Sequence, residues 1–169
     1  MTPADYEYIS NFLLGTSGLA LGTGKEYLVE ARLIPLAQSL GLEGISELVE
    51  ELKKGAELKV TSGVTEAMTT NETSFIRDKT PFEELTNHLI PQLMEGRKIS
   101  KKLKIWCAAA ATGQEPYTIS MILNESFPQL RNWTIEILAT DIDQQALEPG
   151  PSLILVKMRK MRQGICILL

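Results

Sequence analysis

The chain has 169 residues with a net charge of −4 and a pI of about 5.2. Its 44% hydrophobic and 22% charged residues are typical of a globular protein and argue against disorder. The acidic balance argues against nucleic-acid binding, and two cysteines with one histidine are too few for a disulfide framework or a multi-histidine metal centre. Since no apolar run nears the roughly 20 residues that cross a bilayer and no signal peptide is recognisable, we expect a soluble, cytoplasmic protein without membrane insertion.

Residues 1–62 predict a small all-helical domain. Thr2-Pro3 has the form of a helix start, with a hydroxyl N-cap followed by a proline. Glycines between residues 15 and 24 predict a loop. Two further helices are expected, one from Lys25 to Leu40 with a kink or break at Pro35 and a stop at Gly41, the other from Ser46 to about Gly55.

Residues 63–100 predict linking helices interrupted by the polar run Thr69–Thr73. The second helix has the pattern of a capping box, with Thr80 at the N-cap, Pro81 at the first helical position and Glu83 at the third. Its expected buried stripe consists of Phe82, Leu85, Leu89 and Leu93. His88 lies off this stripe, so we expect it to be exposed and without a catalytic role.

Residues 101–148 predict the start of an α/β domain. An apolar run from Lys101 to Ala109 has strand character, a turn of small residues follows, and a helix begins near Pro116. A second strand spans Trp133 to Thr140 and ends in Asp141-Ile142-Asp143. Strand, helix and strand at this spacing predict a βαβ unit with parallel strands.

The turn after the first strand and the acid after the second suggest a nucleoside-containing ligand. Small side chains allow a ligand to approach the helix N-terminus closely, and Asp141 is placed to accept hydrogen bonds from ribose hydroxyls. A tight turn that only serves packing, and a strand-end cap at Asp141, explain the same residues. Glu115 would repel a pyrophosphate but suits an ammonium group, which favours S-adenosylmethionine over NAD.

Three segments resemble the chemotaxis receptor methyltransferases of the CheR type. They are Thr69–Asp78 (TTNETSFIRD), Trp106–Tyr117 (WCAAAATGQEPY) and Ala139–Asp143 (ATDID), and the resemblance covers about Met1 to Leu147. It implies a Rossmann-like methyltransferase domain preceded by a small all-helical domain. The implied activity is methyl transfer from S-adenosylmethionine to glutamate side chains on the cytoplasmic helices of chemoreceptors, which gives γ-methyl esters without a metal.

By this resemblance the cofactor contacts are Asn71, Thr73, Arg77, Glu115 and Asp141. Arg77 is also the candidate catalytic residue: it could hold the methionyl carboxylate, orient the substrate carboxylate, or bond only to a helix end. Two positions depart from the family pattern. Ala109 stands where many members have glycine, and Gln114 where many have a glutamate.

Residues 149–169 depart from the family pattern, because from Pro149 onward the chain has four basic residues and no acidic one. We interpret them as an atypical tail, frameshifted or otherwise aberrant, on a truncated methyltransferase domain with at most a stub of a third strand at Leu153–Val156. A two-stranded remnant would leave apolar edges open, so we expect weak cofactor binding and a tendency to aggregate. A non-catalytic module that binds S-adenosylmethionine or docks on a receptor is the alternative to an enzyme.

Overall fold

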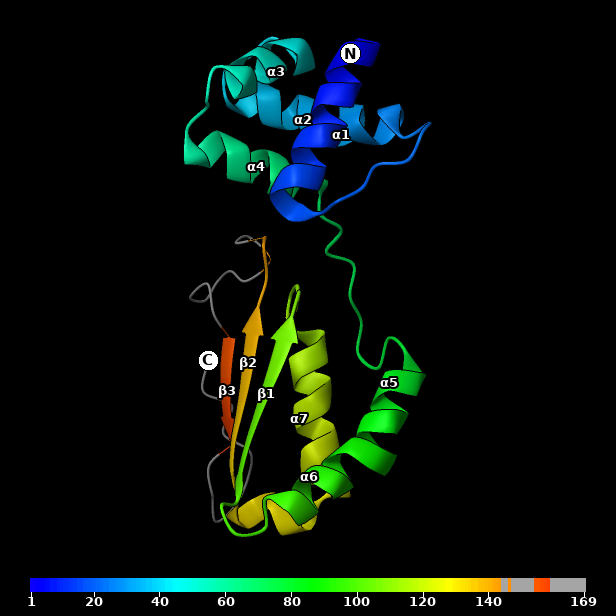
Figure 1. Cartoon of the computed structure of the whole chain (residues 1–169), viewed down its shortest axis with the longest axis vertical. Helices are drawn as coiled ribbons and strands as arrows, with labels where there is room; N and C mark the ends of the chain where they lie inside the picture. Colours follow the sequence, from blue (N-terminus) through cyan, green and yellow to red (C-terminus); the bar gives the residue numbers. More distant parts are fainter. Residues whose placement is uncertain (144–145, 147–153, 159–169) are drawn as a thin grey trace. The chain divides into compact units, whose positions relative to one another are not determined.

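The computed structural model describes residues 1–143, 146 and 154–158. The chain divides into two compact units, Met1–Thr70 and Asn71–Leu169, each of which is described by itself (Figure 1). The first unit is all-helical and the second is α/β, as the sequence predicts. Within the described residues, no helix is long and apolar enough to span a membrane.

The first unit consists of four helices: α1 (Pro3–Ser17), α2 (Glu26–Ser39), α3 (Ile45–Lys53) and α4 (Leu58–Met68). Thr2 caps α1 as predicted, and Asp5 completes a capping box that the sequence analysis did not identify. The α2 helix continues through Pro35, so the expected break is absent there, and Gly41 follows its end with φ 77°. Helix α1 extends through Gly15 to Ser17, and α4 starts at Leu58, earlier than Gly63, where the helix was expected.

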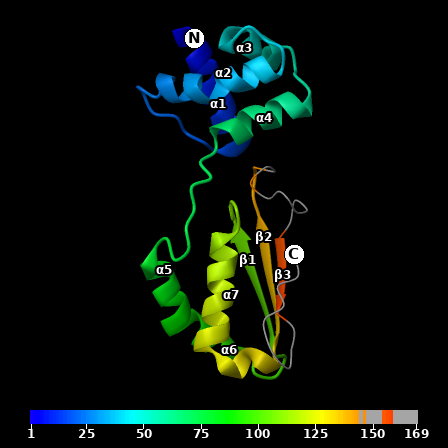
Figure 2. The ribbon, with the colours of Figure 1, turned by 180° about the vertical axis from the view of Figure 1, so that it is seen from behind.

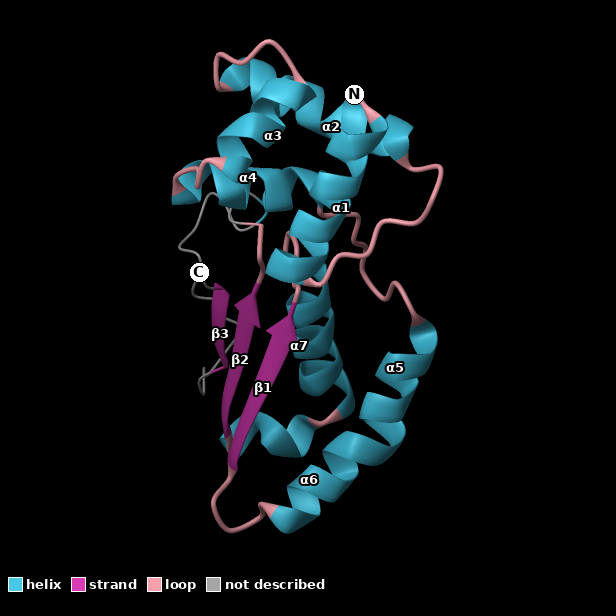
Figure 3. Cartoon of the chain, turned by 45° about the horizontal axis from the view of Figure 1, so that its top comes forward, coloured by secondary structure: helices cyan, strands magenta, loops and turns pink. Residues whose placement is uncertain are grey.

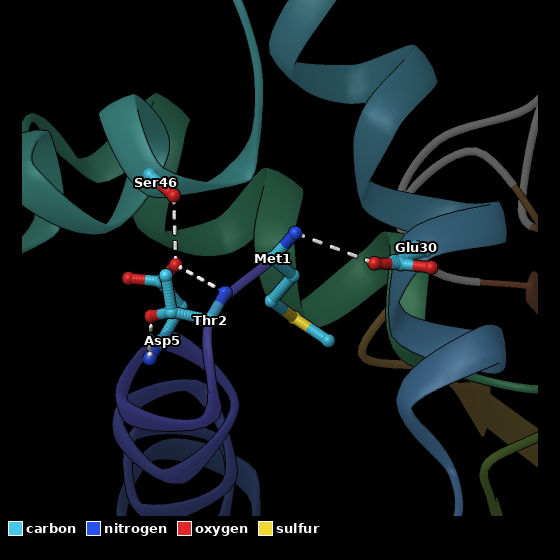
Figure 4. Close-up of polar contacts among 5 residues, drawn as sticks. All are labelled: Met1, Thr2, Asp5, Glu30 and Ser46. Atoms are coloured by element: carbon cyan, nitrogen blue, oxygen red, sulfur yellow. Dashed lines mark hydrogen bonds and ion pairs between the residues drawn. The ribbon is translucent and has the colours of Figure 1, made fainter.

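One apolar cluster holds the four helices together. Its fully buried members come from all of them and include Ile9, Leu33, Leu48 and Val64. Polar contacts also link the helices: Asp5 of α1 accepts a hydrogen bond from Ser46 of α3 at 2.7 Å, and the Met1 amino group lies 3.4 Å from Glu30 of α2 (Figure 4).

The first helices of the second unit form a continuous run: α5 (Lys79–Glu84), a π-helical turn η1 (Leu85–Leu89) and α6 (Ile90–Gly96). The predicted capping box is wrong, because the helix begins at Lys79 after Asp78, which leaves Thr80 inside it and no side-chain cap bond. Pro81 still falls in the first helical turn, where no N–H partner is needed.

The predicted stripe is also wrong at Leu89, which is 49% exposed, whereas Ile90 is fully buried. The Ile90 N–H donates to the Leu85 carbonyl, and this wide turn moves the buried face by one residue. A regular α-turn would bring the ring of Pro91 against the carbonyl four residues earlier, which gives a physical reason for the π-turn. His88 is exposed as expected, with its Nε2 3.9 Å from Glu84.

The predicted βαβ unit is confirmed. Strand β1 (Lys102–Ala108) pairs in parallel with β2 (Thr134–Thr140), with Lys102 opposite Thr134 and Ala108 opposite Thr140. Helix α7 (Gln114–Ser126) and a short 3-10 turn, η2 (Pro128–Asn132), connect the strands. The view from behind shows α7 lying along one face of the sheet (Figure 2).

A third strand, β3 (Ile154–Met158), pairs antiparallel with β2, so the sheet order is β1-β2-β3 (Figure 3). The expected remnant of two strands with a stub at Leu153–Val156 is therefore corrected: among the described residues, β3 coincides with 154–156 of that stub and extends to Met158, and β2 is paired on both sides. The predictions for Leu147, Glu148 and most of the tail 149–169 concern residues outside those that the structure describes.

The core of the second unit lies between the sheet and its helices. Leu103 and Cys107 of β1, with Ile135 and Ile137 of β2, face inward and pack with α7 and Ile90. On the opposite face, Lys104 pairs with Glu136 at 3.3 Å, and Trp106, 68% exposed, donates from Nε1 to Thr140 Oγ1 at 3.0 Å. This arrangement places the carboxyl ends of β1 and β2 beside the N-terminus of α7.

Candidate functional site

The loop between β1 and α7 has a strained backbone. Ala109 and Ala111 have φ values of 63° and 46°, and Gly113, the N-cap of α7, has φ 96°. The left-handed conformation costs an L-residue about 1–2 kcal/mol, so other contacts must hold the two alanines there. The Ala110 N–H donates to the Thr140 carbonyl at 3.0 Å, and the Gly113 N–H to the Ala110 carbonyl at 2.9 Å.

Asp141 supplies the contact that fixes this loop. Its Oδ2 accepts from the Ala111 N–H at 2.7 Å, and its Oδ1 accepts from the Asp143 N–H at 2.9 Å. The side chain thus has the strand-end role that the sequence left open. An ionised carboxylate has about four lone-pair sites, so two bonds leave capacity for hydroxyl groups of a ligand.

Glu115 lies at the other end of the loop. It is exposed in the first turn of α7, where the helix dipole favours a carboxylate. Glu115 also affects the buried Cys107 thiol. Burial is the main cause that raises the pKa of Cys107 to about 12, and the negative charge of Glu115 and a hydrogen bond with Glu115 add to it. The thiol is therefore protonated at neutral pH.

The segment Asn71–Asp78 has no regular secondary structure and is held at its two ends. The Asn71 side chain donates from Nδ2 to Asp143 Oδ2. Near the other end, the Ile76 N–H donates to Thr118 Oγ1 of α7 at 3.3 Å. These bonds attach the segment to Asp143, the last residue of the ATDID motif, and to Thr118, which directly follows the motif Trp106–Tyr117.

The predicted site residues differ in how the structure places them. Asn71 and Asp141 are linked through Asp143. Glu115 lies in the first turn of α7, the helix that follows the loop held by Asp141. Arg77 is exposed and its Nη1 donates to the Glu72 carbonyl; among the described residues it forms no ion pair with Glu115 or Asp141. The half-buried Thr73 side chain makes no hydrogen bond within the described part of the chain.

Sequence reasoning missed two residues that organise the site. Asp143 is 6% exposed and Thr118 is 1% exposed, and each accepts a bond from the segment Asn71–Asp78. Asp143 had a usable signal, because a second acid two positions after a strand-end acid is itself placed at the sheet edge. Thr118 had none, since a threonine inside a helix is unremarkable.

The arrangement suits a cationic nucleoside. Ala108 and Ala109 are exposed at the carboxyl end of β1, so no large side chain covers the loop there. Two carboxyl groups, Glu115 and Asp141, and the amide of Asn71 stand around this edge, which favours an ammonium and hydroxyl groups over a phosphate. These residues fit S-adenosylmethionine, which carries a sulfonium and an ammonium and no phosphate.

Comparison with known proteins agrees with this chemistry. Residues 71–163 match the family model described as CheR methyltransferase, SAM binding domain, and residues 4–61 match CheR methyltransferase, all-alpha domain. The first match continues past Leu147, where the resemblance was expected to end, so part of the tail is also similar to the family.

Several curated relatives are similar over most of this chain. Chemotaxis protein methyltransferase 1 of Pseudomonas aeruginosa is 38% identical over 150 residues, 85% of this chain and 53% of the relative. A chemotaxis protein methyltransferase of Vibrio parahaemolyticus is 37% identical over 152 residues, 88% of this chain and 54% of the relative. Cher2 of Pseudomonas putida is 38% identical over 142 residues, 82% of this chain and 51% of the relative.

The chain spans about half the length of these curated relatives. Both domain matches, in the order helical then α/β, correspond to the two units of the structure. The chain therefore belongs to the CheR methyltransferase family, and its α/β unit is an S-adenosylmethionine-binding domain.

Proposed function

We propose that this chain serves methyl transfer from S-adenosylmethionine to glutamate side chains of chemoreceptors in the cytoplasm, giving γ-glutamyl methyl esters. The relatives' names support the chemotactic role, and the match to a SAM-binding domain supports the donor. The observation that carries the proposal is the set of hydrogen bonds from Asn71 through Asp143 and Asp141 to Ala111, which joins the three motif segments.

The chemistry requires positioning more than proton transfer. A glutamate side chain with a pKa of about 4.3 is already ionised at neutral pH and needs no general base. When bound, S-adenosylmethionine supplies a methyl group that its sulfonium charge has activated. The protein then has to hold the two reactants in line, an effect that reaches about 7–11 kcal/mol at best.

Five residues are the proposed cofactor contacts: Asn71, Thr73, Arg77, Glu115 and Asp141. The free lone pairs of Asp141 would accept ribose hydroxyls, and Glu115 would face the cationic part of the donor. Arg77 has five N–H donors, so its bond to the Glu72 carbonyl leaves others to hold a carboxylate of the donor or of the receptor glutamate.

The experiment that tests the proposal incubates the chain with a receptor cytoplasmic fragment and methyl-labelled S-adenosylmethionine. We expect label on the receptor that is released as methanol by mild base, which distinguishes a carboxyl ester from an N-methyl group. Glu115→Gln should reduce the labelling by at least about tenfold, the loss of one charge-assisted contact. Donor binding without transfer would identify a non-catalytic module, and the absence of donor binding would reject the proposal altogether.

A further inference from the structure

We propose that Asp143 is a positioning residue of the cofactor site, which holds Asn71 and Asp141 in place without itself being a cofactor contact. The inference rests on the proposed function for what the site binds. It rests on the structure for how the site is held.

Asp143 forms hydrogen bonds through both of its carboxylate oxygens and through its backbone N–H. Its Oδ2 accepts from Asn71 Nδ2, its Oδ1 accepts from the Ala146 N–H at 3.3 Å, and its own N–H donates to Asp141 Oδ1 at 2.9 Å. The residue is 6% exposed. A buried carboxyl group is costly unless it is hydrogen-bonded, so these bonds stabilise one arrangement of their donors.

The bond to Asn71 joins residues 72 positions apart. Asn71 begins an irregular segment. Among the described residues, the other hydrogen bond from this segment to the rest of the unit joins the Ile76 N–H to Thr118 at 3.3 Å, and the Arg77 side chain donates to Glu72 of the same segment. Loss of the Asp143 carboxyl group would therefore release one of the two attachments. Asn71 and Thr73, both half-buried, would lose their fixed positions first.

The bond from the Asp143 N–H to Asp141 also connects Asp143 to the strained loop between β1 and α7. Asp141 holds the Ala111 N–H with one oxygen while the other oxygen accepts from the Asp143 N–H. Because Ala111 has φ 46°, its conformation depends on such contacts. Asp143 thus lies between the Asn71 segment and the loop, and it couples the two through one carboxyl group and one N–H.

The test uses the whole 169-residue chain and two measurements: amide hydrogen exchange without ligand, and calorimetric binding of S-adenosylhomocysteine. In Asp143→Ala we expect exchange of the Ile76 N–H, the amide of this segment that donates to Thr118 Oγ1, to rise at least about tenfold while β1 stays protected, because few bonds hold the segment. We expect the affinity for S-adenosylhomocysteine to fall about tenfold or more, the effect of one lost ordering contact. Asp78→Asn is the matched control: it lies at the end of the same segment, is exposed and makes no cap bond to α5.

A second pair of variants distinguishes positioning from a general loss of stability. Asn71→Ala and the double variant with Asp143→Ala complete a cycle. If Asp143 acts largely by holding Asn71, removing its carboxyl group has no further effect once Asn71 is gone, so the double variant binds about as weakly as Asn71→Ala alone. Independent, multiplying losses would overturn the proposal, as would unchanged exchange of the Ile76 N–H in either single variant. Should Asp143→Ala not fold, Asn71→Ala removes the same bond and its exchange decides the question.

Failure of the proposed function is recognised separately. If the unaltered chain does not bind S-adenosylhomocysteine, the assignment of the site's ligand fails. The exchange measurement still decides whether Asp143 holds the segment.

Discussion

Asp5 shows how much one carboxyl group can organise in a small helical unit. Its Oδ2 accepts from the Thr2 N–H at 2.9 Å and from the Ser46 hydroxyl at 2.7 Å, while its own N–H donates to Thr2 Oγ1 at 3.2 Å (Figure 4). The bond from the Thr2 backbone is the main cause that lowers the pKa of Asp5 below its ordinary value, and the Ser46 bond adds to it. The ionised form is thereby favoured in the folded state.

The lowered pKa predicts how the stability of the first unit depends on pH. The contribution of Asp5 is fully present above the pKa of an unfolded aspartate, about 3.9, and is lost as the pH falls through the lower folded value. Asp5→Asn should cost about 1 kcal/mol at pH 7, the typical value of a helix cap, and progressively less in acid. Urea unfolding by far-UV circular dichroism at several pH values measures this. Glu7→Gln, exposed on the same helix, is the control, and a constant difference down to the lowest pH would contradict the argument.

Cys107 is predicted to be chemically inert. Burial first, and the neighbouring Glu115 second, raise its pKa to about 12, so the reactive thiolate is scarce. In a Cys166→Ser variant, which leaves one cysteine, a thiol reagent at pH 8 should react about a thousandfold more slowly with the folded chain than with the chain in urea. Glu115→Gln should speed the folded reaction, since it removes a charge that opposes ionisation. Equal rates in folded and unfolded chain would show that the thiol is accessible and ionised.

At the scale of elements, Arg32 of α2 holds the C-terminus of α4. Its Nη1 donates to the carbonyls of Met68 and Thr69 at 2.8 and 2.7 Å, and its Nη2 lies 3.2 Å from Thr70 Oγ1. The last carbonyls of a helix lack internal partners, and a cation at this end also opposes the negative end of the helix dipole.

Arg32→Lys keeps the positive charge but replaces the planar guanidinium group, with its several N–H donors, by a single ammonium group. One ammonium group cannot reproduce donors to both carbonyls and the hydroxyl, so the first unit should lose about 1–2 kcal/mol of stability. Urea unfolding by circular dichroism tests this, with Arg131→Lys, exposed in the second unit, as the matched control. Unchanged stability in Arg32→Lys would mean that the charge alone caps α4.

Local signals account for the elements that the sequence predicted well. Thr2-Pro3 and Gly41 mark helix ends through their own backbone preferences, and the βαβ unit follows from apolar runs of the right length. The errors fall in the helical run from Lys79 to Gly96, where the sequence analysis assumed a regular helix from Thr80 onward. The π-turn before Pro91 places Ile90 in the core where Leu89 was predicted. The helix begins at Lys79, one residue before Thr80, which was predicted to be its N-cap.

In the candidate site, features local to one segment could be predicted from the sequence, and contacts between distant segments could not. The small-residue loop and the acid at Asp141 were recognisable because each follows a strand directly. The Asn71–Asp143 bond joins residues 72 positions apart, and the contact between Glu115 and the Cys107 thiol depends on how α7 packs on β1. Such pairings follow from the packed fold and have no periodic signature in the chain.

At the scale of the whole molecule, the two units have separate cores. One apolar cluster is built from residues between Ile9 and Met68, and the other from residues between Ile90 and Ala139. Each has its own fully buried side chains, such as Leu33 in the first and Leu123 in the second. A domain with its own core can unfold as a unit, so the chain need not melt in one step.

This separation predicts that a ligand of the second unit stabilises that unit alone. Trp106 and Trp133, the two tryptophans of the chain, both lie in the second unit, so tryptophan fluorescence follows it while far-UV circular dichroism follows both. S-adenosylhomocysteine at a hundred times its dissociation constant should stabilise the second unit by about 2.7 kcal/mol. The fluorescence midpoint on heating should therefore rise by several degrees, while the part of the dichroism transition due to the first unit stays in place. Glu115→Gln should reduce this rise without changing the first unit. A single transition that shifts as a whole in both signals would show instead that the two cores melt together.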